Sequence, residues 1–131
     1  MYLLDTDTII YALKGDPKVT RRFEEAVAHP KALSVITYGE LFYGAMKSAA
    51  VEANLARVRR MAELFPVVEV SRPIVETFGS VKADLGRRGR VVDDFDLLIA
   101  ATALTLNYRL VTNNERHFRG IPGLHVENWA R

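Results

Sequence analysis

Short apolar runs alternate along this chain with longer segments of helical periodicity, and this alternation limits the fold more than any other feature of the sequence. The runs are too short to be ordinary helices, and their continuous apolar character suits strands that are buried on both faces of a sheet. Strands that alternate with helices usually belong to a parallel sheet with helices packed on it. We therefore expect an α/β domain with a mostly parallel central sheet.

The pattern predicts strands at residues 2–4, 32–35, 67–70, 109–112 and 124–126. It predicts helices at residues 6–13, 17 to about 28, 36–47, 51–64, 73 to about 86, and 95–106. The last of these helices is apolar almost all round, so it should be buried. Because there is no repeat, no low-complexity stretch and no long linker, we expect residues 1–131 to form a single domain.

The composition excludes several kinds of protein. A chain of 131 residues with 49% hydrophobic and 26% charged residues can build a core and is not expected to be disordered. The absence of cysteine excludes disulfide frameworks, thiolate nucleophiles and zinc ribbons. The net charge of +2 is only mildly basic, but arginines gather at positions 57, 59 and 60 and at 87, 88 and 90. Each group fits either a solvated helix face or phosphate binding.

The sequence contains no recognisable targeting or membrane segment. The first apolar run ends at Asp5, where a signal peptide would continue its apolar region. No stretch approaches the roughly 20 apolar residues that a membrane helix requires. We expect a soluble, cytoplasmic protein that has no membrane partner.

Two carboxylates stand where an open parallel sheet places its sites, just beyond the carboxyl ends of strands. Asp5 ends the first strand, although an aspartate there can also cap the following helix. Glu40 follows the second strand, although Thr37 and Glu40 also have the spacing of a capping box. For both residues the structural and the functional interpretation remain open.

A third carboxylate, Asp96, is harder to explain structurally. Its neighbours three, four and seven positions along the expected helix are apolar, so the side chain should be drawn toward the interior. Burying an unpaired charge is costly, so a helix N-terminus, a cation or a metal must compensate it. Asp93 and Asp94 are better candidates for capping this helix, which leaves Asp96 available for another role.

Convergence of these acids would require a cation. If Asp5, Glu40 and Asp96 meet, their repulsion raises their pKa values or demands a positive partner. Oxygen ligands without cysteine or a positioned histidine favour a hard ion such as Mg²⁺, for which Mn²⁺ can substitute. Such an ion in an open acidic site activates water for attack on a phosphodiester. The metal and flanking arginines would attract the polyanionic substrate.

Four motifs in this order resemble the PIN-domain ribonucleases of the VapC toxin type. They are YLLDTD at 2–7, SVITYGEL at 34–41, DLLIAATA at 96–103 and LVTNN at 110–114, and the resemblance covers nearly the whole chain. It implies a three-layer α/β/α fold and Mg²⁺- or Mn²⁺-dependent cleavage of RNA. It carries Asp5, Glu40 and Asp96 over as the metal-site acids.

The resemblance also implies secondary roles. Asn114 stands where the family often has a fourth acid, so the sequence does not predict a second metal, and Asn114 is expected to orient water or substrate. Further accessory candidates are Thr6, Thr112, Asp93 and Asp94.

The resemblance further implies a toxin–antitoxin system. A small antitoxin would cover the active site and bind DNA through its other half, and the toxin would form a homodimer. An antitoxin needs an apolar groove, which Tyr38, Phe42, Tyr43 and Met46 could supply at helical spacing. The same residues could instead be ordinary core.

Three alternatives remain. The LDTDT run resembles the opening motif of haloacid-dehalogenase-type phosphatases, but in that family the threonine motif precedes the acidic pair, whereas Thr112 follows Asp93 and Asp94. A phospho-receiver domain fits in size, but it requires an aspartate at the end of the third strand, where Ser71 stands. A catalytically inactive binding module with the PIN fold is the third alternative.

Overall fold

The computed structural model describes all 131 residues as alternating strands and helices. The strands are β1 (Tyr2–Leu4), β2 (Lys31–Ser34), β3 (Val67–Val68), β4 (Arg109–Val111) and β5 (Val126–Glu127). The helices are α1 (Thr6–Leu13), α2 (Pro17–Glu25), α3 (Val35–Met46), α4 (Val51–Leu64), α5 (Arg72–Arg87), α6 (Asp94–Leu106) and α7 (Glu115–Phe118). None of the helices combines the length and the apolar character that crossing a membrane demands.

All five strands lie in one sheet in the order β3-β2-β1-β4-β5. Every neighbouring pair is parallel, which confirms the predicted parallel sheet. The chain builds outward from β1 to β3 and then crosses back to add β4 and β5 on the other side of β1. The strand order therefore reverses between β1 and β4, and ligand sites of open α/β sheets form at such a switch point.

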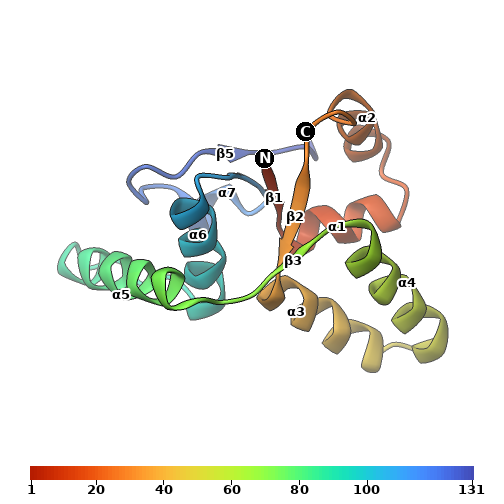
Figure 1. Ribbon diagram of the computed structural model, residues 1–131, viewed down its shortest axis with the longest axis horizontal. Coiled ribbons are helices and arrows are strands. Elements are labelled where there is room, and N and C mark those ends of the chain that lie inside the picture. Colours follow the sequence, from red (N-terminus) through yellow and green to blue (C-terminus); the bar gives the residue numbers. More distant parts are fainter.

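Helices cover both faces of the sheet, as the predicted three-layer α/β/α fold requires (Figure 1). Side chains alternate between the faces along each strand. Leu3 and Leu110 pack with residues of α5, α6 and α7 on one face. Leu4 and Val111 pack with residues of α1 to α4 on the other. The sheet is thus the middle layer, with a separate apolar core on each side.

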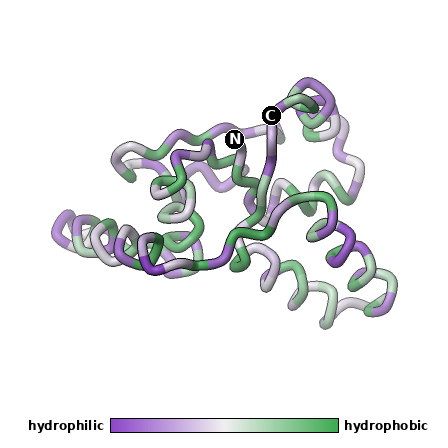
Figure 2. The backbone as a smooth tube through the Cα atoms, viewed as in Figure 1, coloured by the Kyte–Doolittle hydropathy of each residue, from purple (hydrophilic) through white to green (hydrophobic).

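The apolar helix α6 is buried, as predicted. Its fully buried residues run through the middle of the helix, from Leu97 to Ala103. Figure 2 shows hydrophilic residues concentrated on outlying parts of the molecule, such as α2 and the far end of α5. Because α6 packs between α5 and the sheet, its N-terminal end is held close to the carboxyl ends of the strands.

Some predicted boundaries were wrong. Helix α2 ends at Glu25 and not near Ala28. Residues 26–28 continue as turns, and the side chain of Lys31 donates to carbonyl oxygens of this segment. The Lys31 ammonium lies 2.6 Å from the Ala26 oxygen and 2.9 Å from the His29 oxygen. Helix α7 was not predicted at all, since four residues are too few to display a helical period.

Candidate active site

Asp5 lies at the carboxyl end of β1, and only 4% of its surface is exposed. Its Oδ1 accepts a hydrogen bond of 2.8 Å from the backbone N–H of Thr6, so Asp5 does cap α1. Its Oδ2 accepts a hydrogen bond of 2.8 Å from the hydroxyl of Thr112 at the end of β4. The capping interpretation is therefore correct, but it uses only one of the two carboxylate oxygens.

The surroundings of Asp5 disfavour its charged form. Burial, the largest cause, together with the charge of Asp7 raises the pKa of Asp5 to about 7. The hydrogen bonds from Thr112 and Thr6 lower this pKa, and the charge of Asp96 raises it further. Asp5 is thus a buried acid whose ionisation is opposed by the charges of Asp7 and Asp96, and a cation beside it would stabilise its ionised form.

Glu40 on α3 turns toward α1 and not toward its own helix terminus. Its Oε1 accepts a hydrogen bond of 2.7 Å from the hydroxyl of Thr6, the residue that follows Asp5. The capping-box alternative is wrong, because Ser34 caps α3 through the N–H of Ile36. The hydroxyl of Thr37 is buried without a hydrogen-bond partner. Glu40 is therefore tied to the carboxyl end of β1 through Thr6.

Asp96 lies in the first turn of α6, and its side chain is 18% exposed. Asp93 caps this helix as predicted, since its Oδ2 accepts from the N–H groups of Phe95 and Asp96 at 3.1 and 3.4 Å. Asp96 instead contacts His117 of α7, whose Nδ1 lies 2.7 Å from its Oδ2. Because a carboxylate can only accept, Nδ1 carries the proton in this contact.

The loop after β4 contacts the two aspartates of the first motif, Asp5 and Asp7. The hydroxyl of Thr112 donates a hydrogen bond to Asp5 and accepts one of 3.0 Å from the N–H of Asn114. The N–H of Asn113 donates to Oδ2 of Asp7 at 3.1 Å, and burial raises the pKa of Asp7 as well. The side chain of Asn114 is exposed and makes no hydrogen bond.

Two residues of this site, Asp7 and His117, were not predicted from the sequence. Asp7 is part of the first motif, and its place two residues after Asp5 was the available signal. His117 lies on the short helix that was not predicted, so nothing in the sequence pattern joined it to Asp96. Two of the accessory candidates, Asp93 and Asp94, make contacts outside the site. Asp94 forms an ion pair of 2.8 Å with Lys82, and the contacts of Asp93 are those of a helix cap.

The donor atoms of Asp5, Glu40 and Asp96 are carboxylate oxygens, the type that suits a hard divalent ion, but the structure does not gather the three around one point. No three acidic or histidine side chains are already arranged around one metal position. The three acids are instead linked in pairs. The charge of Asp96 raises the pKa of Asp5, and Thr6 donates hydrogen bonds to both Asp5 and Glu40. Carboxylate oxygens are the ligands that Mg²⁺ and Mn²⁺ prefer. A bound cation would stabilise the ionised form of Asp5 and so lower its raised pKa.

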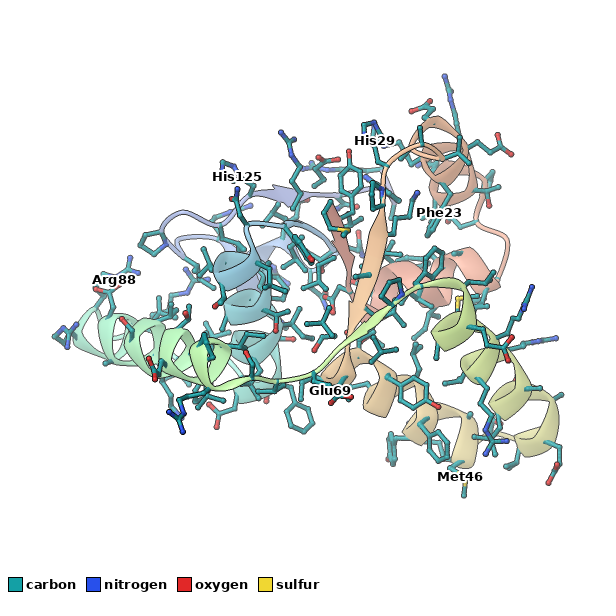
Figure 3. All side chains as sticks on the ribbon, in the orientation of Figure 1. Phe23, His29, Met46, Glu69, Arg88 and His125 are labelled. Carbon is teal, nitrogen blue, oxygen red and sulfur yellow. The ribbon has the colours of Figure 1, made fainter.

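Apolar hollows flank Glu40. One of about 630 Å³ is lined by residues that include Ile10, Tyr43 and Phe95, and a second of about 300 Å³ lies toward α4. Tyr43 and Met46 are 65% and 52% exposed, and Figure 3 shows Met46 projecting away from α3. Of the four residues expected to form an apolar groove, the other two, Tyr38 and Phe42, are half-buried.

Comparison with known proteins identifies the family. The model of the PIN domain family matches residues 2–124. The chain is 36% identical over 129 residues to the "tRNA(fMet)-specific endonuclease VapC" of Salmonella typhimurium, covering 98% of both chains. It is 35% identical over 130 residues to "Ribonuclease VapC2" of Haemophilus influenzae, again covering 98% of both.

A solved structure agrees with these matches. The crystal structure of VapBC2 from Rickettsia felis, bound to a DNA fragment from its promoter, superposes with a TM-score of 0.91 at 32% identity, covering 98% of both chains. Together the matches favour the predicted family over the phosphatase and phospho-receiver alternatives. This protein belongs to the PIN domain family and, within it, to the VapC proteins.

Proposed function

We propose that this protein is a Mg²⁺- or Mn²⁺-dependent endoribonuclease that acts as the toxin of a toxin–antitoxin pair in the cytoplasm. Its VapC relatives carry the names of ribonucleases, and the solved structures include VapBC complexes. The observation that carries the proposal is the state of Asp5. Asp5 is 4% exposed at the switch point, and its two oxygens accept hydrogen bonds from Thr6 and Thr112. Burial and the charges of Asp7 and Asp96 raise its pKa to about 7, so a cation beside it would stabilise its ionised form.

Asp5, Glu40 and Asp96 would hold the ion through their carboxylates. When bound, a hard divalent ion neutralises the crowded acids and makes water a better nucleophile toward the phosphorus of an RNA phosphodiester. The protein contributes fixed orientation, because each acid has a hydrogen-bond donor of its own. Those donors are the Thr6 hydroxyl for Glu40, the Thr112 hydroxyl for Asp5 and the His117 ring for Asp96. Such outer partners orient the ligands of a metal site.

Asn114 takes a lesser part in this proposal. Its exposed amide lies at the rim, beyond Thr112, where it can orient water or the RNA. Because an amide oxygen brings no negative charge, Asn114 would add less affinity for a second cation than the fourth acid often found at this position. We therefore propose that one ion occupies the site.

The test is cleavage by the purified protein. Total RNA and initiator tRNA, the latter because the Salmonella relative is specific for tRNA(fMet), are incubated with Mg²⁺, Mn²⁺ or EDTA, and the new 5′ ends are sequenced. We expect discrete cuts with either ion, none in EDTA, and none with Asp5→Asn. Glu52→Gln, which removes an exposed acid on α4, is the matched control and should cut normally. Cutting by Asp5→Asn at the wild-type rate, or activity in EDTA, would contradict the proposal.

A cognate antitoxin is the expected protein partner. We propose that it binds over the apolar hollows beside Glu40, where Ile10, Tyr43 and Phe95 are exposed, and that its other half binds DNA. Co-expression with the neighbouring reading frame should relieve growth arrest, and Tyr43→Ala should weaken the complex. Arrest that the neighbour does not relieve would argue against the pair. We also expect the toxin to be a homodimer, which light scattering on the purified protein measures.

A further inference from the structure

A hollow of about 330 Å³ lies at the N-terminal end of α6, where Asp93 is one of its lining residues. It is formed by the segment that joins α5 to α6 and by α7, with a lining of Arg90, Val91, Val92, Asp93, Arg116 and His117. His117 both lines this hollow and contacts Asp96 at 2.7 Å. A ligand held in the hollow would therefore lie directly beside the candidate active site.

Positive charge is concentrated around this hollow. Residues 86–93 and 114–120 contain five arginines, at positions 87, 88, 90, 116 and 119, and two acids, Asp93 and Glu115. Arg88 forms an ion pair of 3.0 Å with Asp84, so four of the five arginines have no ion-pair partner. The whole chain, by comparison, has a net charge of only +2. Both acids are already engaged. Asp93 caps α6, and Glu115 accepts from Asn128 at 3.0 Å and from Arg131 at 2.8 Å.

Two of these arginines hold the wall of the hollow in place. Nη2 of Arg90 donates to the carbonyl oxygens of Arg116 and His117 at 2.9 and 3.3 Å, and Nη2 of Arg88 donates to that of Gly120 at 2.9 Å. Carbonyl oxygens carry no net charge, so the positive charge of Arg90 is not neutralised by these bonds. Arg90 thus fixes α7 and keeps the hollow electropositive.

Arg116, which lines the hollow, and Arg119, which follows it three residues later, are free to bind a ligand. Arg116 and Arg119 are exposed, and neither guanidinium forms an ion pair or a hydrogen bond within the protein. The carbonyl of Arg116 is held by Arg90, so the backbone at Arg116 is already ordered before a ligand binds. An arginine can bind the oxygens of a phosphate through two parallel hydrogen bonds.

We propose that this basic hollow binds the RNA backbone next to the cleaved phosphodiester, with Arg116 and Arg119 contacting phosphate oxygens. This inference rests on the proposed ribonuclease function. The acids around Asp5 repel a polyanion, so binding energy for the RNA has to come from cations nearby. The hollow is where unneutralised arginines lie beside Asp96 on a fixed wall.

The test measures RNA binding without cleavage. A fluorescein-labelled single-stranded RNA of about 15 nucleotides, long enough for a groove of this kind, is titrated in EDTA and followed by fluorescence anisotropy. We expect Arg116→Ala to weaken binding about three- to tenfold near physiological salt, and the double variant with Arg119→Ala to weaken it further. The slope of log affinity against log salt should fall by about one for each phosphate that the variant no longer neutralises.

Arg59→Ala is the matched control, since Arg59 is an exposed arginine on α4 that forms no ion pair. It should leave binding and the salt slope unchanged, and melting temperatures check that every variant is folded. The proposal is wrong if the wild type does not bind the RNA, if Arg116→Ala binds as tightly as the wild type, or if Arg59→Ala weakens binding equally. It is also wrong if Arg116→Ala weakens binding of the antitoxin and not of RNA.

The cleavage assay separates this inference from the function on which it rests. If the wild type cuts RNA and Arg116→Ala cuts it with the same KM, the function stands and the hollow is not an RNA site. If the wild type never cuts RNA but Arg116→Ala loses RNA binding, the ribonuclease proposal fails and the hollow remains an RNA-binding surface. We expect cleavage by the wild type and an increase in KM for Arg116→Ala.

Discussion

The hydroxyl of Thr112 donates a hydrogen bond of 2.8 Å to Oδ2 of Asp5, although the two residues are 107 positions apart in the chain. The bond joins the carboxyl ends of β4 and β1, the neighbouring strands between which the strand order reverses. Asp5, the acid whose pKa is raised to about 7, therefore lies at the switch point of the sheet. The donors that hold the acids at this point can be tested one at a time.

Thr112→Val removes the hydroxyl but preserves the shape of the side chain. Because the hydrogen bond from Thr112 lowers the pKa of Asp5, its loss should raise that pKa further and weaken binding of Mn²⁺ at neutral pH about tenfold. Isothermal titration calorimetry measures the affinity. Thr112→Ser keeps the hydroxyl and should bind Mn²⁺ nearly as the wild type does. Equal affinities for the Val and Ser variants would show that the hydroxyl has no such role.

Asp5→Asn should change how stability depends on pH. Asp5 has a pKa of about 7 in the folded protein against 3.8 as its ordinary value, so the folded state holds the proton more tightly. The stabilisation that this provides is complete below about pH 4 and is lost as the pH rises through 7. Asparagine does not ionise, so the stability of the variant relative to the wild type should increase between pH 4 and pH 8. Three pKa units set an upper bound of about 4 kcal/mol for this gain.

Urea unfolding in EDTA at pH 4, 6 and 8 measures this difference. A stability difference between Asp5→Asn and the wild type that is the same at all three values would contradict the raised pKa. Adding Mg²⁺ at pH 8 should raise the melting temperature of the wild type, because an ion that binds only the folded state stabilises it. The same addition should have little effect on Asp5→Asn.

Thr6→Val tests the link between Thr6 and Glu40. The variant loses the hydroxyl that lies 2.7 Å from Oε1 of Glu40, so this carboxylate is no longer held toward Asp5. We expect RNA cleavage to fall about tenfold, with a loss of only about 1 kcal/mol in stability, typical of one hydrogen bond. Thr6→Ser should retain most of the activity. Single-turnover cleavage rates compare the two, and unchanged cleavage by Thr6→Val would show that Thr6 does not position Glu40 for the reaction.

His117→Ala tests the second link, between α7 and Asp96. Without the ring nitrogen at 2.7 Å, Asp96 is free to rotate, and we expect the affinity for Mn²⁺ to fall three- to tenfold, at the low end of what outer partners contribute to metal affinity. His117→Asn places an amide nitrogen close to the position of Nδ1 and should restore part of that affinity. Calorimetry on both variants gives the result. An alanine variant that binds Mn²⁺ as tightly as the wild type would contradict a positioning role.

The sequence predicted the fold well because its signals are local. Apolar runs predicted β1 and β4, the apolar helix α6 is buried, and the aspartate pair before Asp96 supplied the cap of that helix at Asp93. Each of these features depends on neighbours within a few residues, so periodicity and capping preferences are sufficient to find it.

Long-range side-chain partners could not be predicted in the same way. The contacts of Glu40 with Thr6 and of Asp96 with His117 join elements far apart in the chain, and their geometry depends on how the helices pack. The two arginine groups illustrate the same limit. Arg60 pairs with Glu63 on its own helix, whereas Arg90 reaches across to fix α7. No pattern in the sequence distinguishes these two roles.

A crystal structure of the protein soaked in Mn²⁺, with anomalous scattering used to locate the ion, would show whether the acids share one cation. We predict one anomalous peak at the carboxyl ends of β1 and β4, with carboxylate oxygens of Asp5 and Asp96 within bonding distance and Glu40 beside it. A peak elsewhere on the molecule, or none here at saturating Mn²⁺, would contradict the proposed metal site.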